Sequence, residues 1–133
     1  MGPRRGLILF AHGSSDPAWG RTLHALAERI AALEPALQVR CAFLERQAPA
    51  LPAVLAELAP RVDHLDVCPV FWAANGHVQR DLPALLEQAR QAHPGLALRL
   101  LPVLSELPGM LDFLAATVGA LASATDPSPA PSR

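Results

Sequence analysis

Short apolar runs alternate along this chain with segments whose apolar residues recur every three or four positions. The runs at residues 7–11, 37–44, 64–72 and 96–104 each predict a buried β-strand. The periodic segments at residues 17–33, 49–60, 81–92 and 108–124 predict helices. In the first helix the stripe marks the face that an amphipathic helix turns to the core, and it consists of Trp19, Leu23, Leu26, Ile30 and Leu33.

This alternation predicts a single α/β domain whose parallel sheet is covered by helices on both faces. Right-handed crossovers bring the carboxyl ends of all the strands to one edge. We expect a flavodoxin-like strand order of 2-1-3-4, in which the first and third strands are neighbours. The domain is expected to cover residues 1–125, and the Pro/Ser-rich segment 126–133 to be a disordered tail.

Composition narrows the possible functions. All 11 cations are arginine, and the absence of lysine excludes a Schiff base and a P-loop. A net charge of -1 gives no basic field for nucleic acid or for an anionic membrane. No segment resembles a signal peptide or a membrane span, and Cys41 and Cys68 both sit in apolar runs as buried, reduced thiols would. We therefore expect a soluble, cytoplasmic protein.

Polar residues are concentrated directly after the predicted strands, at the edge where open α/β sheets bind ligands. After the first strand come His12, Gly13 and Ser14, and after the second Glu45 and Arg46. After the third come Asn75, Gly76, His77 and Arg80. Each alone has an ordinary explanation as a loop or surface residue. Two histidines and a carboxylate converging on one cleft nevertheless predict a metal or proton-transfer site.

Three motifs carry a resemblance to a known family. They are "HGSSDP" at residues 12–17, "FLE" at 43–45 and "GHVQRDLP" at 76–83. In this order and approximate spacing they resemble the ATP-independent, class II chelatases of the sirohydrochlorin type, which insert cobalt, iron or nickel into a tetrapyrrole precursor of cobalamin, siroheme or coenzyme F430. The resemblance covers about the first two thirds of the chain. Long members of that family carry two such halves, and the short form, which this chain resembles, works as a homodimer.

The resemblance implies a site and a mechanism. His12 and His77 would deliver the metal and take the pyrrole protons, with Glu45 as a further ligand or proton acceptor. Arg46 and Arg80 could pair with the many carboxylates of sirohydrochlorin. The full set expected to contact the substrate is Ser14, Arg46, Asn75, Gly76 and Arg80. No cofactor is expected to be bound permanently, because the divalent metal is itself a substrate.

The chain also departs from the family pattern, and two rival functions stay open. Ser15 stands where arginine is frequent, Asn75 where a second glycine is common, and residues 105–108 differ from the usual stretch. One rival is a metal or tetrapyrrole carrier that uses the same histidines without turnover. The other is phosphoryl or acyl transfer through His12 or Ser14, although the chain lacks both an arginine before its His-Gly pair and a Gly-x-Ser-x-Gly elbow.

Overall fold

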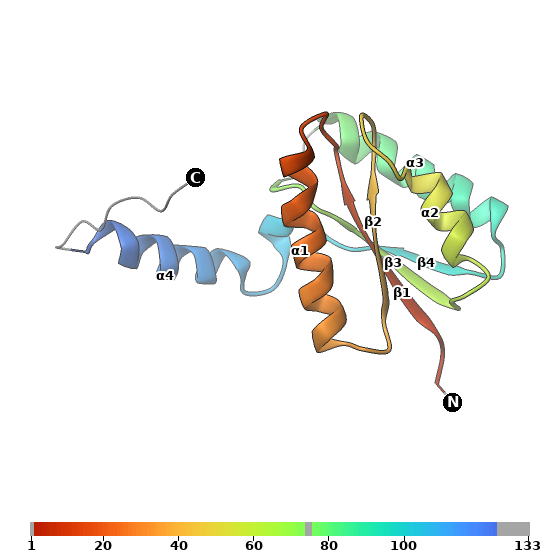
Figure 1. The fold of residues 1–133 in the computed structure, drawn as a ribbon, viewed down its shortest axis with the longest axis horizontal. Helices are drawn as coiled ribbons and strands as arrows, with labels where there is room; N and C mark the ends of the chain where they lie inside the picture. The colour runs from red at the N-terminus through yellow and green to blue at the C-terminus, as the bar shows by residue number, and fades with distance from the viewer. Residues whose placement is uncertain (1, 74–75, 125–133) are drawn as a thin grey trace.

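The computed structural model describes residues 2–73 and 76–124, leaving aside the side chains of residues 76–80. Strands and helices alternate along this part of the chain, with one short 3-10 helix, η1, before the last helix (Figure 1). The elements are β1 (Arg5–Ala11), α1 (Pro17–Leu33), β2 (Gln38–Phe43), α2 (Leu51–Leu58), β3 (His64–Pro69), α3 (Gly76–Ala92), β4 (Ala97–Leu100), η1 (Leu104–Glu106) and α4 (Met110–Ala122).

The four strands form one parallel sheet in the order β2-β1-β3-β4, which confirms the predicted topology. β1 is central and pairs with β2 on one side and with β3 on the other. The loops that leave β1, β2 and β3 therefore emerge from the same edge of the sheet (Figure 1). That edge holds the predicted site.

The start of α3 differs from the sequence-based expectation. The predicted range begins at Asp81, because an aspartate followed two residues later by proline is a typical helix start. The helix instead begins at Gly76 and contains Pro83 in its interior. Proline lacks the amide N–H that would bond to the carbonyl of residue 79, so it removes one helical hydrogen bond without ending the helix here. As a result His77 belongs to the first turn of a helix and not to a loop.

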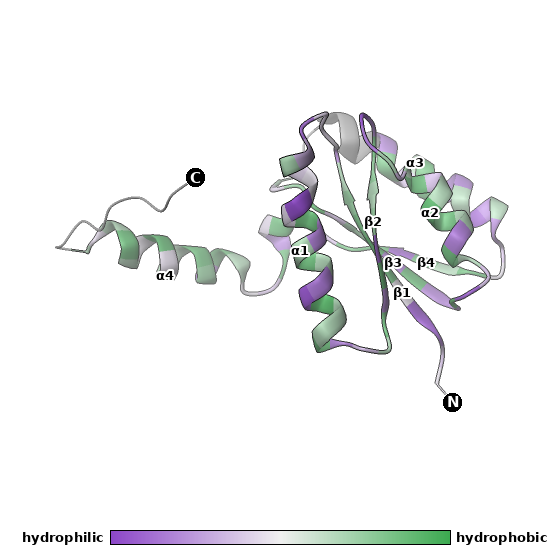
Figure 2. Ribbon diagram, in the orientation of Figure 1, coloured by the Kyte–Doolittle hydropathy of each residue, from purple (hydrophilic) through white to green (hydrophobic). Residues whose placement is uncertain are grey.

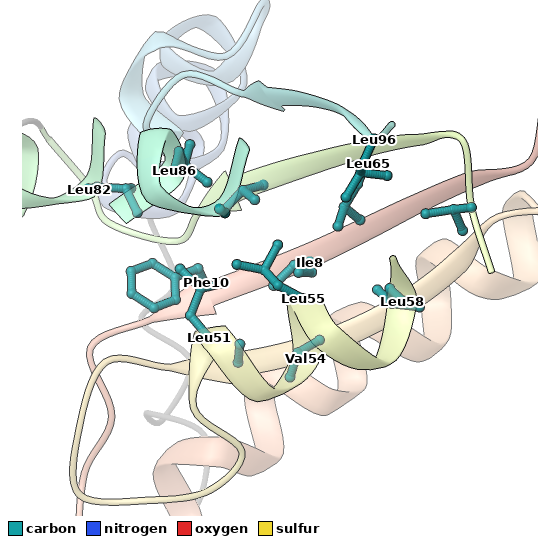
Figure 3. Packing of buried hydrophobic residues seen from close by; sticks show 14 residues of the cluster. Ile8, Phe10, Leu51, Val54, Leu55, Leu58, Leu65, Leu82, Leu86 and Leu96 are labelled. Carbon is teal, nitrogen blue, oxygen red and sulfur yellow. The ribbon is translucent and has the colours of Figure 1, made fainter. Parts of the chain in front are cut away.

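The main core lies between the sheet and helices α2 and α3 (Figure 3). Ile8 and Phe10 of β1 contribute to its centre, and both are fully buried. The stripe predicted for α2, Val54, Leu55 and Leu58, is buried in this core. Of the stripe predicted for α3, Leu82, Leu86 and Ala89 are buried and Leu85 is half-buried. This face of the sheet is packed as the sequence predicts.

The opposite face is covered less completely. Its core contains Leu7 and Leu9 of β1 and Leu23 of α1, with Ile30 partly buried against it. The predicted stripe of α1 is otherwise exposed, since Trp19, Leu26 and Leu33 keep 45%, 39% and 80% of their surface accessible. The expectation that this stripe faces the core is therefore wrong for these three residues, because no other helix covers them within the described chain.

Helix α4 extends away from the rest of the domain (Figure 1). It contacts the body chiefly through η1, and none of its 13 residues is buried. Figure 2 shows it as apolar along almost its whole length, although it projects from the body. Among the described helices, none combines the length and the apolar character needed to cross a bilayer.

The two cysteines are buried and free, as expected. Cys41 of β2 and Cys68 of β3 both stand opposite Leu9 of the central strand. Two strand spacings separate them, about 9–10 Å, whereas a disulfide needs Cα atoms within about 7 Å of each other. Burial raises the pKa of both thiols above the usual value.

The proposed tail, residues 126–133, lies outside the described residues, so its disorder stays a prediction.

Candidate functional site

The loops after β1 and β2 run side by side at the carboxyl edge of the sheet. Beyond the last paired residues, the backbone N–H of Leu44 donates to the carbonyl of Ala11 at 2.9 Å. The N–H of Glu45 then donates to the carbonyl of His12 at 3.1 Å. These bonds continue the β1–β2 ladder by two residues, so the strand pairing itself places His12 beside Glu45.

The side chains of His12 and Glu45 meet at this edge. Nε2 of His12 lies 3.3 Å from Oε1 of Glu45, and about half of each side chain is exposed, 50% and 51% respectively. A neutral imidazole carries a lone pair on one of its two ring nitrogens, and that nitrogen can bind a metal ion. The pair can therefore offer one imidazole nitrogen to a metal while the carboxylate accepts or holds a proton.

Arg46 lies near the same carboxylate oxygen as His12. Its Nε lies 3.8 Å from Oε1 of Glu45, and its backbone has a φ of 68°, in the left-handed region. Its side chain is 67% exposed, so solvent screens this pair and the guanidinium keeps donors for another anion. Arg46 thus lies beside the His12–Glu45 pair, and its role in substrate binding stays a prediction.

Gly13 permits the close approach of the two loops. Its φ is 98°, and a Cβ atom added there would lie 2.0 Å from the carbonyl oxygen of Glu45. Any side chain at this position would drive the loops apart. The glycine in the His-Gly pair is required by the backbone of the neighbouring loop, a constraint that the sequence alone does not show.

Gln47 ties the two loops together and was not predicted. Its Oε1 accepts a hydrogen bond from the backbone N–H of Ser14 at 2.9 Å, across 33 residues of chain. Its Nε2 would lie 2.9 Å from a Cβ added at Gly20, so the buried Gly20 leaves room for this amide. The one signal in the sequence is Gly20 in the first turn of α1, but the sequence does not show that Gln47 packs against it.

Ser14 and Asp16 organise the turn that leads into α1. The Ser14 hydroxyl accepts from the N–H of Asp16 at 3.1 Å, and the Asp16 carboxylate caps the helix by accepting from the N–H of Ala18 at 2.9 Å. The hydroxyl proton of Ser14 is left to donate to a ligand. The substrate contact predicted for Ser14 is therefore compatible with its structural role in the turn.

The remaining predicted residues belong to the segment that follows β3. The N–H of Val70 donates to the carbonyl of Phe10 at 2.7 Å, so the chain leaves β3 beside the end of β1. Gly76, His77 and Arg80 then lie in the first two turns of α3, and Asn75, also predicted to contact the substrate, lies outside the described residues. Within the described side chains, which exclude residues 76–80, no group of three or more His, Cys, Asp or Glu gathers to hold a metal. Of the residues predicted to bind or deliver the metal, His12 and Glu45 are two that the structure brings together.

The parallel 2-1-3-4 sheet places the chain in the class of flavodoxin-like α/β domains, and a histidine and a carboxylate lie side by side at the carboxyl edge of this sheet. Comparison with known proteins gives the family. The sequence profile of the CbiX family matches residues 6–120. This chain belongs to the CbiX family.

Individual relatives agree with this assignment. A sirohydrochlorin cobaltochelatase from Methanosarcina acetivorans is 30% identical over 87 residues, which is 65% of this chain and 67% of that protein. A sirohydrochlorin cobaltochelatase from Methanococcoides burtonii is 26% identical over 96 residues, which is 71% of this chain and 73% of the relative.

Solved structures match the fold. A protein from Marinobacter aquaeolei, described as a CbiX protein of cobalamin (vitamin B12) biosynthesis, superposes with a TM-score of 0.74 and 29% identity, covering 87% of this chain and 95% of its own. SirB from Bacillus subtilis with Fe³⁺ superposes with a TM-score of 0.74 and 20% identity. That match covers 91% of this chain but 47% of SirB, and at such identity it supports the fold alone.

Proposed function

We propose that this chain is an enzyme that inserts a divalent metal ion into sirohydrochlorin without ATP. Membership of the CbiX family and the two relatives named sirohydrochlorin cobaltochelatase support the reaction. The observation that carries the proposal in the structure is the His12–Glu45 pair, 3.3 Å apart and half exposed at the ligand-binding edge of the sheet. The pair combines a metal ligand with a proton acceptor, which are the two functions that metallation requires.

In this mechanism His12 binds the incoming ion through the ring nitrogen that does not face Glu45. Each metal ion that enters the macrocycle displaces two pyrrole protons, so a base must stand close to the point of entry. Glu45 orients the ring of His12 and can receive a proton from it. Because both side chains are exposed, released protons can pass on to solvent.

His77 is the proposed second metal ligand and base. Its position in the first turn of α3, a helix whose chain leaves β3 beside β1, supports a place at the same edge. The amino end of a helix carries partial positive charge, which suits a substrate with many carboxylates. Arg80 and Arg46 would pair with those carboxylates, and Ser14, Asn75 and Gly76 would contribute further contacts to the macrocycle.

The metal itself is a substrate, and no permanently bound cofactor is proposed. Imidazole and carboxylate ligands bind cobalt, iron and nickel alike, so selectivity would depend on which ion the cell supplies. We place the reaction in the cytoplasm, which two buried and reduced thiols support. We also propose that the protein works as a homodimer, because α4 exposes apolar side chains that a second copy would cover.

The alternative function is a non-catalytic carrier of metal or tetrapyrrole, which would use the same ligands. Turnover distinguishes the two. With sirohydrochlorin and Co²⁺ both in large excess over protein, an enzyme accelerates conversion of the whole pool, followed by the shift in sirohydrochlorin absorbance and corrected for spontaneous insertion. Conversion that stops at one equivalent per protein, or that equals the spontaneous rate, would establish a carrier instead.

A further inference from the structure

The sheet has two outer strands, and each has one side without a neighbouring strand. Within the described chain β2 pairs with β1 alone, and β4 pairs with β3 alone. Such an open side presents backbone N–H and C=O groups to which a strand of another molecule can add. Natural sheets cover or interrupt these groups, often with lysine. This chain contains no lysine, so cationic protection must come from arginine.

An arginine of α3 covers the open side of β4. The N–H of Leu101 donates to the carbonyl of Val67 in β3 at 2.8 Å. Because the backbone groups of successive residues point to opposite sides of a strand, those of Leu98 face outward. Nη2 of Arg90, in the last turn of α3, donates to this outward carbonyl at 3.3 Å. Nη1 of the same side chain donates to Oε2 of Glu87, one turn earlier, at 3.2 Å.

β2 has the same arrangement on the other outer side of the sheet. The N–H of Leu44 donates to the carbonyl of Ala11, so by the same alternation the backbone groups of Val39 face outward. Nη1 of Arg40 donates to the carbonyl of Val39 at 3.0 Å, and its Nε donates to Oε2 of Glu57 in α2 at 3.1 Å. On each outer strand, then, one guanidinium bonds to an outward carbonyl and to a helix glutamate.

The backbone itself covers a second outward position on each strand. Phe43 faces outward on β2, and its N–H donates to the carbonyl of Pro49 at 2.9 Å, so the chain's own loop occupies that place. Pro102 follows β4 at an outward position and has no N–H to donate. Cys41 and Leu100 each remain between two covered positions. A ladder needs several outward residues in succession, so one residue gives little to pair with.

The two arginine–glutamate pairs are poorly placed to stabilise the fold. The side chains of Arg40 and Glu57 are 35% and 42% exposed, and those of Arg90 and Glu87 are 42% and 60% exposed. Ion pairs this open to water contribute little to stability, because solvent screens them and ordering two long side chains costs entropy. Their common feature is the outward carbonyl that each arginine covers.

We propose that the Arg40–Glu57 and Arg90–Glu87 pairs block strand addition at the two open sides of the sheet. Each glutamate holds a guanidinium across the open side, so an added strand would have to displace a charged group from its carbonyl. The excluded partner is an extended apolar strand, in particular an outer strand of a second copy of this chain. Since each copy has two open sides, such pairing would not close and would produce growing assemblies.

This inference is independent of the proposed function. Neither pair contains a residue of the proposed site, so a failure of strand blocking would leave the chelatase unaffected. The homodimer of the proposed function is likewise a different contact, because it covers the apolar side chains of α4 and not the outer strands.

The test compares full-length variants that each lose one arginine. Arg40→Ala and Arg90→Ala each uncover one outer strand. Arg4→Ala is the matched control, because Arg4 also bonds to a carboxylate and a carbonyl, those of Asp63 and Pro60. It stands at the start of β1, which has neighbouring strands on both sides. All three arginines are on the surface, so each variant should fold.

Light scattering from micromolar to near-millimolar protein gives the readout. One edge-to-edge contact doubles the mass of the associating unit, so Arg40→Ala and Arg90→Ala should exceed the wild-type mass about twofold or more at the highest concentration. These assemblies should also bind thioflavin T, a dye for stacked β-strands. Arg4→Ala should match the wild type in both measurements.

Urea unfolding at low protein concentration separates strand addition from loss of the fold. The midpoints of Arg40→Ala and Arg90→Ala should equal that of Arg4→Ala, because all three variants lose an exposed ion pair. Midpoints well below the control would show that the pairs act on stability, and would overturn the proposal. Wild-type mass for both variants at every concentration, or equal association by Arg4→Ala, would overturn it as well.

Discussion

Replacing Gly13 by alanine tests how tightly the two loops of the site are joined. The added Cβ would lie 2.0 Å from the carbonyl oxygen of Glu45, far inside van der Waals contact, at a backbone φ of 98°. A non-glycine residue with positive φ costs about 1–2 kcal/mol. Relief of the clash also breaks the bond from the Glu45 N–H to the His12 carbonyl, which contributes about 0.5–1.5 kcal/mol. We expect Gly13→Ala to lower the free energy of unfolding by about 1.5–3.5 kcal/mol.

Gly109→Ala is the matched control. Gly109 shares a positive φ of 82°, but an added Cβ meets no atom within 4 Å. This variant should therefore lose only the backbone cost of about 1–2 kcal/mol. Urea unfolding of both variants and the wild type at one protein concentration gives the comparison.

The two variants should also differ in activity. Gly13→Ala separates His12 from Glu45 and should metallate sirohydrochlorin slowly while still folded, whereas Gly109→Ala should keep its site geometry. Equal losses of stability in the two variants, or wild-type metallation by Gly13→Ala, would show that the loops do not need this close approach.

Two further predictions concern the supports of the site and the buried thiols. Gln47→Ala removes the acceptor of the Ser14 N–H, and we expect the misplaced loop to lower the metallation rate about tenfold or more. Gln47→Glu keeps an acceptor oxygen and should recover most of this rate. Equal rates for Gln47→Ala and the wild type would show that the Gln47–Ser14 hydrogen bond does not position His12. Cys41 and Cys68 should resist a thiol reagent at neutral pH until urea unfolds the chain. Burial raises the pKa of both thiols, and the neutral thiol is the unreactive form. Rapid modification of the folded protein would contradict this burial.

The sequence predicted the topology well because apolar strands and helical stripes depend on local patterns. The 2-1-3-4 order, the helices on the main core and the edge that holds His12 and Glu45 are all confirmed by the structure. The start of α3 was predicted too late, since Asp81 and Pro83 together have the pattern of a helix start while the chain was already helical from Gly76.

Features that depend on contacts between distant residues could not be predicted. Gln47 bonds to Ser14 across two loops, and the need for Gly13 arises from a carbonyl of the other loop. The exposure of Trp19 and Leu26 has a similar origin, because their stripe has the correct period but no other helix of the described chain packs on it. The spacing of apolar residues shows which face of a helix is apolar, but it does not show which other element packs on that face.

The central claim is that His12, Glu45 and His77 perform metallation, and single alanine variants test it directly. The assay is the absorbance shift of sirohydrochlorin on addition of Co²⁺ or Fe²⁺ without ATP. His12→Ala and His77→Ala should each lose about 10²–10⁴-fold in rate, and Glu45→Ala should lose less. His64→Ala is the control, because His64 begins β3 at the opposite edge of the sheet and its loss should leave the rate unchanged. A folded His12→Ala or His77→Ala variant that metallates at the wild-type rate would contradict the account.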